Sequence, residues 1–259
     1  MIRYKLYFII PAPISFWIKI IFHIFKFRKV YVAYKHITIN QTESDREQEG
    51  IILTDESYKQ EHFYAEFFHK NFGQIKNKKL DILEIGLAKG AGIASFYFYF
   101  PFSNLIGVDN NPFKTRYKSK RIRNMYVDIS SRQILKNLTN HLNQKFDLII
   151  EDCSHKLIDQ ILCFSENFKN LKKGGIYIVE DLNFPEIHKM YNPTNEAVDL
   201  KTILKKINLG EEIFTKFMKE NEIEYIQNNI ENIKFYKGHD NSEIVFIKKK
   251  VHGTEKEPS

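Results

Sequence analysis

Two short acidic runs could carry the chemistry of this chain. The first is Glu151-Asp152-Cys153-Ser154-His155 and the second is Glu180-Asp181, and each directly follows an apolar stretch. Hard divalent cations such as Mg²⁺ prefer carboxylate oxygens, so Asp152 and the Glu180-Asp181 pair could converge on one such ion. An imidazole titrates near neutrality, and a metal-bound hydroxyl loses its proton more easily than a free one. His155 could therefore serve as the base for such a hydroxyl.

The elements that must position these residues are the strands of a sheet. Five successive apolar stretches end on an acid, at Glu84, Asp109, Asp128, Asp152 and Asp181. Helical patterns alternate with them at 93–100, 131–142 and 156–171, which predicts a parallel, doubly wound sheet. The carboxyl ends of such strands meet at one edge, where ligands bind at the switch in strand order. Since like carboxylates repel each other, we expect a ligand or a cation at this edge.

The stretch 80–92 predicts a ligand cradle made of a strand, a glycine-rich turn and the start of a helix. Its glycines allow the backbone to approach a ligand closely, and the following helix offers free N–H groups. A second strand, 105–109, ends on Asp109, whose carboxylate can accept both hydroxyls of a ribose. The order of the glycines differs from the Gly-x-Gly-x-x-Gly of dinucleotide-binding proteins, although glycine turns of this kind occur in many α/β folds.

The glycine turn, Glu84-x-Gly86-x-x-x-Gly90-x-Gly92, resembles motif I of the class I S-adenosylmethionine (SAM) methyltransferases. The acidic runs narrow the resemblance to the macrocin and mycinamicin type of Mg²⁺-dependent sugar O-methyltransferases and to cephalosporin hydroxylase-like proteins. Their pattern is Asp-Asp-Gly-Ser-His after one strand, a Gly-Gly turn into the next, and an acidic pair at its end. The similarity covers roughly residues 54–182.

The resemblance implies a role for each matching residue. It makes His155 and Asp152 catalytic, and it makes Asp152, Glu180 and Asp181 the ligands of Mg²⁺. An upstream Thr-Asp-Lys…His-x-Tyr element of the family is matched in part by Thr54-Asp55-Glu56 and His62-Phe63-Tyr64. The implied SAM contacts are Thr54, Tyr64, Glu84, Gly86, Leu87, Gly90, Asp109, Asn110, Asp128, Ile129 and Glu151.

Three departures from the family pattern leave the metal ligands intact but bear on the shape of the loop. Glu151 stands for Asp, Cys153 for Gly and Glu56 for Lys. Plainer interpretations also exist: His155 could cap the following helix, the acidic pair could be a solvated turn, and Tyr64 could belong to a helix face. Adjacent acids on an extended strand point in opposite directions, so Glu180 and Asp181 can share one ion only if the strand has already turned.

The sequence predicts an α/β, Rossmann-like class I methyltransferase fold with a mostly parallel seven-stranded sheet. A C-terminal antiparallel hairpin is expected from strands at 233–236 and 243–247 joined by a polar turn. A helix ending near 72 precedes the cradle, and 185–210 is expected to be a substrate-side insertion with helices resuming near Leu200 and Glu211. The expected domains are a basic, apolar arm and linker at 1–50, a methyltransferase domain at 51–250 and a polar tail at 251–259.

The net charge of +7 is confined to the N-terminal arm. Residues 1–42 hold seven of the 39 Lys and Arg and no acid, so the remaining 32 match the 32 Asp and Glu of the chain. This distribution argues against a broad nucleic-acid-binding face. Cys153 and Cys163 form neither a disulfide framework nor a metal-binding motif, which suits a reducing cytosol and predicts a cytoplasmic protein.

The arm itself predicts a helix from 14 to 34 in which Lys19, His23 and Lys26 form a narrow basic stripe beside a wide apolar surface. Residues 1–36 could lie in the inner face of a membrane with Trp17 at headgroup depth, or they could pack on the domain or on a second copy in a homo-oligomer. The longest uncharged run, 6–18, is shorter than the roughly twenty residues that span a bilayer, and it contains two prolines.

These observations predict a SAM-dependent, Mg²⁺-assisted O-methyltransferase that acts on a sugar hydroxyl. The acceptor would be a small molecule or glycan, either a cell-surface glycan precursor or a glycosylated natural product. The alternatives are a phosphate-like or small non-sugar acceptor, and a non-catalytic SAM-binding scaffold at a membrane. A nicotinamide-dependent oxidoreductase is disfavoured by the order of the glycines and by the lack of a Tyr-x-x-x-Lys proton relay.

Overall fold

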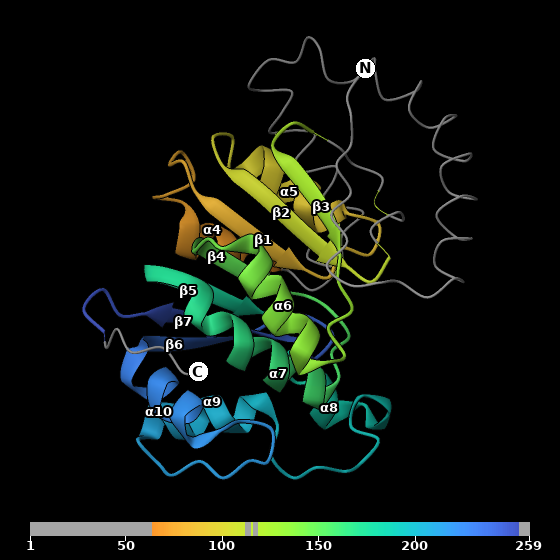
Figure 1. Ribbon diagram of the computed structural model, residues 1–259, viewed down its shortest axis with the longest axis vertical. Helices are drawn as coiled ribbons and strands as arrows, with labels where there is room; N and C mark the ends of the chain where they lie inside the picture. The colour runs from red at the N-terminus through yellow and green to blue at the C-terminus, as the bar shows by residue number, and fades with distance from the viewer. Residues whose placement is uncertain (1–63, 112–114, 116–118, 254–259) are drawn as a thin grey trace.

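The computed structural model describes residues 64–111, 115 and 119–253 of the chain. Within these residues a seven-stranded sheet has the order β3-β2-β1-β4-β5-β7-β6 (Figure 1). The strands are β1 (Asp81–Ile85), β2 (Asn104–Asp109), β3 (Ile122–Tyr126), β4 (Phe146–Glu151), β5 (Leu171–Val179), β6 (Ile230–Lys237) and β7 (Glu243–Lys249). The first five are parallel, and β7 is antiparallel to both β5 and β6. The predicted fold class is therefore confirmed.

The strand order changes direction between β1 and β4. From β1 the chain moves outward through β2 and β3, and it then returns to place β4 on the other side of β1. Glu84 pairs with both Gly107 of β2 and Ile150 of β4, so the carboxyl ends of these strands lie at one edge. This is the position at which open α/β sheets bind their ligands.

Helices cover both faces of the sheet (Figure 1). α4 (Tyr64–Phe72) and α5 (Ala91–Tyr99) pack on one face. α6 (Arg132–Leu142), α7 (Leu157–Asn167), α9 (Leu200–Leu209) and α10 (Glu220–Asn229) pack on the other. Successive strand residues point to opposite faces of the sheet. Ile82 therefore packs in the core beneath α4 and α5, and Leu83 packs in the core beneath the other four helices.

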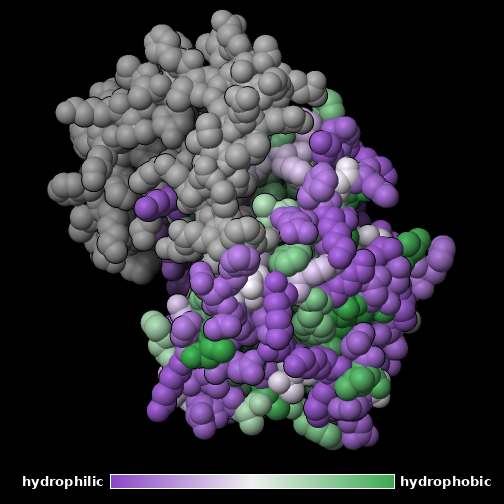
Figure 2. Space-filling view, turned by 180° about the vertical axis from the view of Figure 1, so that it is seen from behind, coloured by the Kyte–Doolittle hydropathy of each residue, from purple (hydrophilic) through white to green (hydrophobic). Residues whose placement is uncertain are grey.

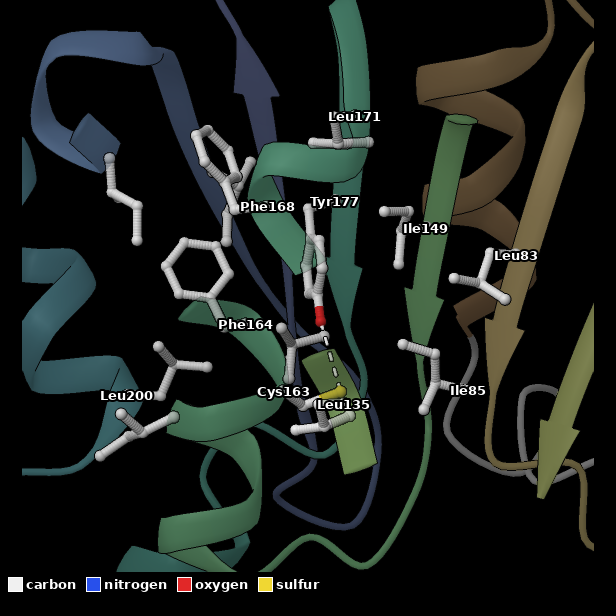
Figure 3. Packing of buried hydrophobic residues seen from close by; sticks show 14 of the residues in the cluster. Leu83, Ile85, Leu135, Ile149, Cys163, Phe164, Phe168, Leu171, Tyr177 and Leu200 are labelled. Atoms are coloured by element: carbon white, nitrogen blue, oxygen red, sulfur yellow. Dashed lines mark hydrogen bonds between the residues drawn. The ribbon is translucent and has the colours of Figure 1, made fainter. Parts of the chain in front are cut away.

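Aromatic rings fill much of the core beneath α7 (Figure 3). Phe164 packs edge-on against Tyr177 of β5, with ring centroids 5.2 Å apart, and Phe168 lies 5.4 Å from Phe164. All three side chains are fully buried. The Tyr177 hydroxyl donates to Cys163 Sγ at 3.7 Å. This hydroxyl is a polar group in the core, on the side nearest the end of β4.

Two predicted helices differ from the structure. The helix expected at 156–171 ends at Asn167, because a 3₁₀ turn, η2 (Phe168–Asn170), leads directly into β5. The expected Gly-Gly turn lies inside β5, where Gly175 packs closely against the Asp147 carbonyl. The helix expected near Glu211 instead begins at Glu220.

Side-chain contacts explain the late start of α10. Glu222 accepts a hydrogen bond from the Lys219 backbone N–H at 2.9 Å and so caps the helix at that point. Arg132 of α6 also donates to the Phe217 carbonyl and pairs with Glu222, which holds the preceding segment in a non-helical path. Helix propensity alone therefore cannot predict where α10 begins.

The arm at 1–50, the linker and most of the predicted upstream element lie outside the described residues. None of the helices in the described ranges combines the length and apolar character needed to cross a membrane. On the face shown in Figure 2, the described surface is mostly hydrophilic, with apolar patches scattered among polar residues. The predicted domain boundaries and the tail remain predictions.

Candidate active site

Three of the predicted residues meet at the carboxyl edge of the sheet. Asp152 and His155 lie in the loop between β4 and α7, and Asp181 follows β5. One ligand atom from each side chain lies within 4.8 Å of the others. His155 Nε2 is 3.9 Å from Asp152 Oδ1 and 3.8 Å from Asp181 Oδ2, which is longer than a direct hydrogen bond. We call Asp152, His155 and Asp181 the edge triad.

Two members of the edge triad have an uncommon backbone conformation. His155 has φ 54° and Asp181 has φ 51°, both in the left-handed region that non-glycine residues rarely adopt. Such conformations cost about 1–3 kcal/mol and concentrate at functional sites. The strand has therefore turned at Asp181, as a shared ion would require.

Glu180, the third predicted metal ligand, does not belong to the edge triad. Its side chain is buried, and its backbone N–H donates to the Glu151 carbonyl at 2.9 Å. Its negative charge contributes to the raised pKa of Tyr64, which places its carboxylate near that ring. Metal binding by Glu180 remains a prediction.

Tyr64 positions the carboxylate of Asp181. The Tyr64 hydroxyl is buried and donates to Asp181 Oδ1 at 2.9 Å. Burial and then the negative charge of Asp181 raise the pKa of Tyr64 well above its ordinary value, so the phenol stays a neutral donor. The sequence predicted a cofactor contact for Tyr64, and the structure gives it this additional partner.

Gln160 is a second residue that holds Asp181 in place, and the sequence did not predict it. The buried Gln160 amide on α7 donates to the Asp181 backbone carbonyl at 3.3 Å. The sequence around Gln160 does not reveal this contact, because it depends on how α7 packs against the end of β5. The two contacts fix Asp181 from both faces of the sheet.

Gly86 joins the glycine turn to the loop that carries the edge triad. It has φ 95°, and a Cβ added there would lie 1.9 Å from the Asp152 carbonyl oxygen. The Asp152 N–H also donates to the Ile85 carbonyl at 2.8 Å. Glycine is therefore required at 86 because the neighbouring backbone fills the space of a side chain.

Asp109 holds the rest of the glycine turn in place. Its Oδ2 accepts hydrogen bonds from the N–H groups of Leu87 at 2.8 Å and Ala88 at 3.1 Å, and Oδ1 accepts from Asn111 at 2.6 Å. A carboxylate oxygen has two lone pairs, so Oδ1 keeps capacity for a ribose hydroxyl. Gly90 has φ 88° and precedes α5, whose first N–H groups face the same edge.

The remaining predicted cofactor contacts follow the same edge. Glu84 is buried near the end of β1, and Asn110 is exposed after β2. Asp128 follows β3 and accepts from the Ser130 N–H at 3.0 Å, while Ile129 packs against the core. Thr54 lies outside the described residues.

Glu151 is directed into the core beneath α7. Its carboxyl accepts from Cys153 Sγ at 3.4 Å and from the Tyr177 hydroxyl at 3.2 Å, and Cys163 belongs to the same buried group. Burial raises the pKa of Glu151 well above its usual range, which favours the uncharged form of this carboxyl. The two residues that depart from the family pattern in this loop therefore contact each other.

The rings of Phe184 and Tyr191 stand beside the predicted base, and the His188 ring packs on both of them. His188 and Tyr191 lie within 185–210, which the sequence predicted as a substrate-side insertion without singling out these residues. α8 (Phe184–Ile187) and η3 (Lys189–Tyr191) follow Asp181. The His155 ring lies 5.1 Å from that of Phe184 and 6.0 Å from that of Tyr191. His188 lies 5.2 Å from Phe184 and 6.0 Å from Tyr191. We call Phe184, His188 and Tyr191 the aromatic wall.

The chain is similar in sequence to known methyltransferases. Residues 76–229 match the family described as methyltransferase domain. Over 128 residues, the chain is 28% identical to the 8-demethyl-8-alpha-L-rhamnosyl tetracenomycin-C 2′-O-methyltransferase of Streptomyces olivaceus. It is 24% identical to the mycinamicin VI 2″-O-methyltransferase of Micromonospora griseorubida. These matches cover 47% of this chain and about a third of each relative, 33% and 32%.

A solved structure shows the same fold. The MycE methyltransferase of the mycinamycin biosynthetic pathway, in complex with Mg, SAH and mycinamycin VI, superposes with a TM-score of 0.56 at 20% identity. The superposition covers 73% of this chain and 49% of MycE. Because the family match spans more than half of the sequence, this chain belongs to the methyltransferase domain family.

Proposed function

We propose that this protein is a SAM-dependent O-methyltransferase that acts with Mg²⁺ on a hydroxyl of a sugar-containing molecule. The observation that carries the proposal is the position of the edge triad, at the same sheet edge as the glycine turn and Asp109. A methyl donor bound by the turn would thus lie beside a candidate base and a pair of carboxylates. The sugar O-methyltransferases to which the chain is similar support the choice of a hydroxyl acceptor.

The edge triad fits a hard divalent cation. Asp152 and Asp181 supply carboxylate oxygens, and Tyr64 orients one of them. Oxygen ligands of this kind suit Mg²⁺ better than softer metals. When bound, the cation would lower the pKa of an acceptor hydroxyl and neutralise its developing negative charge.

The chain's own residues then complete the reaction. His155 takes the proton of the acceptor hydroxyl, and the resulting alkoxide oxygen bonds to the methyl carbon as the carbon–sulfur bond breaks. The products are a methyl ether, S-adenosylhomocysteine (SAH) and a protonated imidazole, which returns its proton to water. Tyr64 and Gln160 keep Asp181 in position throughout. Alignment of the reacting atoms supplies most of the acceleration.

Calorimetric titration of SAH into the purified full chain tests the proposal. We expect micromolar binding, both with MgCl₂ and with EDTA, because the glycine turn and Asp109 recognise SAH without the cation. Methyl transfer from SAM to glycans and glycosides should then require MgCl₂. A folded protein that binds no SAH would refute the proposal, and binding without transfer to any hydroxyl would favour the non-catalytic scaffold.

The finer identity of the acceptor and the place of action are also part of the proposal. A cell-surface glycan precursor would suit an enzyme whose basic, apolar residues 1–36 contact anionic lipid. Co-sedimentation of the full chain with phosphatidylglycerol vesicles should then occur and should weaken at high salt. Failure to co-sediment would favour packing of residues 1–36 on the domain or on a second copy.

A further inference from the structure

The aromatic wall is fixed to the edge triad by backbone contacts. The Phe184 N–H donates to the Asp181 carbonyl at 3.1 Å, and the Tyr191 N–H donates to that of His188 at 3.0 Å. Lys201 pairs with Glu186 at 2.7 Å and with Glu243 at 2.8 Å, which ties α8 to β7. The distance from the wall to His155 is therefore set by the fold.

The wall lies in a segment that leaves apolar side chains in contact with solvent. Phe184 and Tyr191 are half-buried, and His188 is exposed. The described residues contain six exposed large hydrophobic side chains, and two of them, Ile187 at 43% and Met190 at 72%, lie between Phe184 and Tyr191. Ile187 and Met190 therefore leave apolar side chains open to solvent next to the aromatic wall.

The rings of the aromatic wall are not parallel to one another. They make interplanar angles of 36°, 69° and 85° with one another. A puckered ring can place its C–H groups against the faces and edges of such rings at several angles. The C–H groups of a pyranose are attracted to the negative faces of such rings, and its hydroxyls remain at the rim.

We propose that the aromatic wall binds the acceptor, with the apolar face of a pyranose ring against Tyr191 and the hydroxyl that is methylated directed toward His155. This inference rests on the proposed function and deepens it by naming the substrate class and the residue that selects it. Tyr191 contacts both His155 and Phe184, so a ring that packs on Tyr191 lies beside the edge triad.

Saturation-transfer NMR on the full chain tests this, with methyl α-L-rhamnopyranoside as the probe and SAH and MgCl₂ present. In the unmodified protein, the C–H protons of one face of the sugar should receive the most saturation. Tyr191→Ala should weaken the affinity for the glycoside about tenfold, and Tyr191→Phe should retain it, because the ring and not its hydroxyl makes the contact.

The control is Phe214→Ala, which removes a ring that is 72% exposed in the segment between α9 and α10 and should change nothing. Calorimetry with SAH on each variant verifies its fold and separates the two proposals. If SAH binds and the glycoside receives no saturation, or if Tyr191→Ala binds it as well as the unmodified protein, the acceptor wall is refuted while the methyltransferase proposal stands. If SAH does not bind, both the acceptor-binding proposal and the methyltransferase proposal are refuted.

Discussion

His155 is the residue whose loss should separate chemistry from binding. Its Nε2 lies within 4 Å of both carboxylates of the edge triad, and its ring packs on the aromatic wall. We expect His155→Ala to lower turnover by about two to four decades, since a positioned base contributes that much. SAH affinity should be unchanged by calorimetry. His141→Ala, on α6, is the control, and unchanged turnover in His155→Ala would refute the base assignment.

Cys153 has a structural role that the family glycine cannot fill. Its thiol donates to the buried carboxyl of Glu151 at 3.4 Å. Cys153→Gly should therefore lower the free energy of unfolding by about 1–3 kcal/mol, the cost of leaving a buried polar group with one partner fewer. Urea unfolding measures this. Cys153→Ser keeps a donor and should lose less, so a glycine variant as stable as the serine variant would contradict the interpretation.

At the scale of elements, an ion-pair cluster joins three strands at the edge opposite the site. Lys172 of β5 lies 2.8 Å from Asp81 of β1 and 2.8 Å from Asp147 of β4. Burial is the largest single effect and raises the pKa of Asp81. The hydrogen bonds from Lys172 and Asn104 and the charges of Lys172 and Lys79 together outweigh it, so the net pKa is lowered. The stability that this carboxylate contributes is thus present above its unfolded pKa and is lost as pH falls through its lower folded pKa.

Lys172→Met should remove part of this acid dependence. Because Lys172 and Asp81 are both more than one-third exposed, we expect a loss of only about 0.2–1 kcal/mol in the free energy of unfolding at pH 7. The difference between the variant and the unmodified protein should shrink as pH falls below 3.8, the ordinary pKa of Asp81 in the unfolded chain, and the part due to Asp81 should be lost as pH passes through the lower folded pKa. Urea unfolding at pH 7 and pH 3 measures both effects, with the exposed Lys234→Met as the control. A difference that is constant with pH would contradict the assignment.

The elements differ in how far sequence could predict them. Strand ends that carry Glu84, Asp109 and Asp152 follow from local apolar runs, and their convergence follows from parallel topology. The start of α9 at Leu200 was predicted, but that of α10 was not, because the contacts of Arg132 with Glu222 and with the Phe217 carbonyl are tertiary. For the same reason, the sequence could not predict which residues Glu151 and Gly86 contact. A sequence shows which residues reach an edge but not which neighbours they meet there.

For the whole molecule, the candidate site connects separate parts of the fold. Tyr64 from α4 and Gln160 from α7 contact Asp181 from opposite faces of the sheet, and Gly86 contacts the backbone of Asp152. The two helical layers therefore meet through the edge triad. A cation held by Asp152 and Asp181 would link the ends of β4 and β5, so its binding free energy should add to the stability of the entire domain.

Thermal unfolding of the full chain measures this linkage. At a hundredfold excess over its dissociation constant, MgCl₂ should add about 2.7 kcal/mol to the free energy of unfolding and raise the melting temperature by about 5–10 °C over EDTA. Asp152→Asn should lose this increment while keeping the separate increase caused by SAH, because the glycine turn and Asp109 are unaffected. The exposed Asp240→Asn, in the turn between β6 and β7, should keep both. Equal melting temperatures in MgCl₂ and EDTA would refute the cation site while leaving SAH binding by the glycine turn untouched.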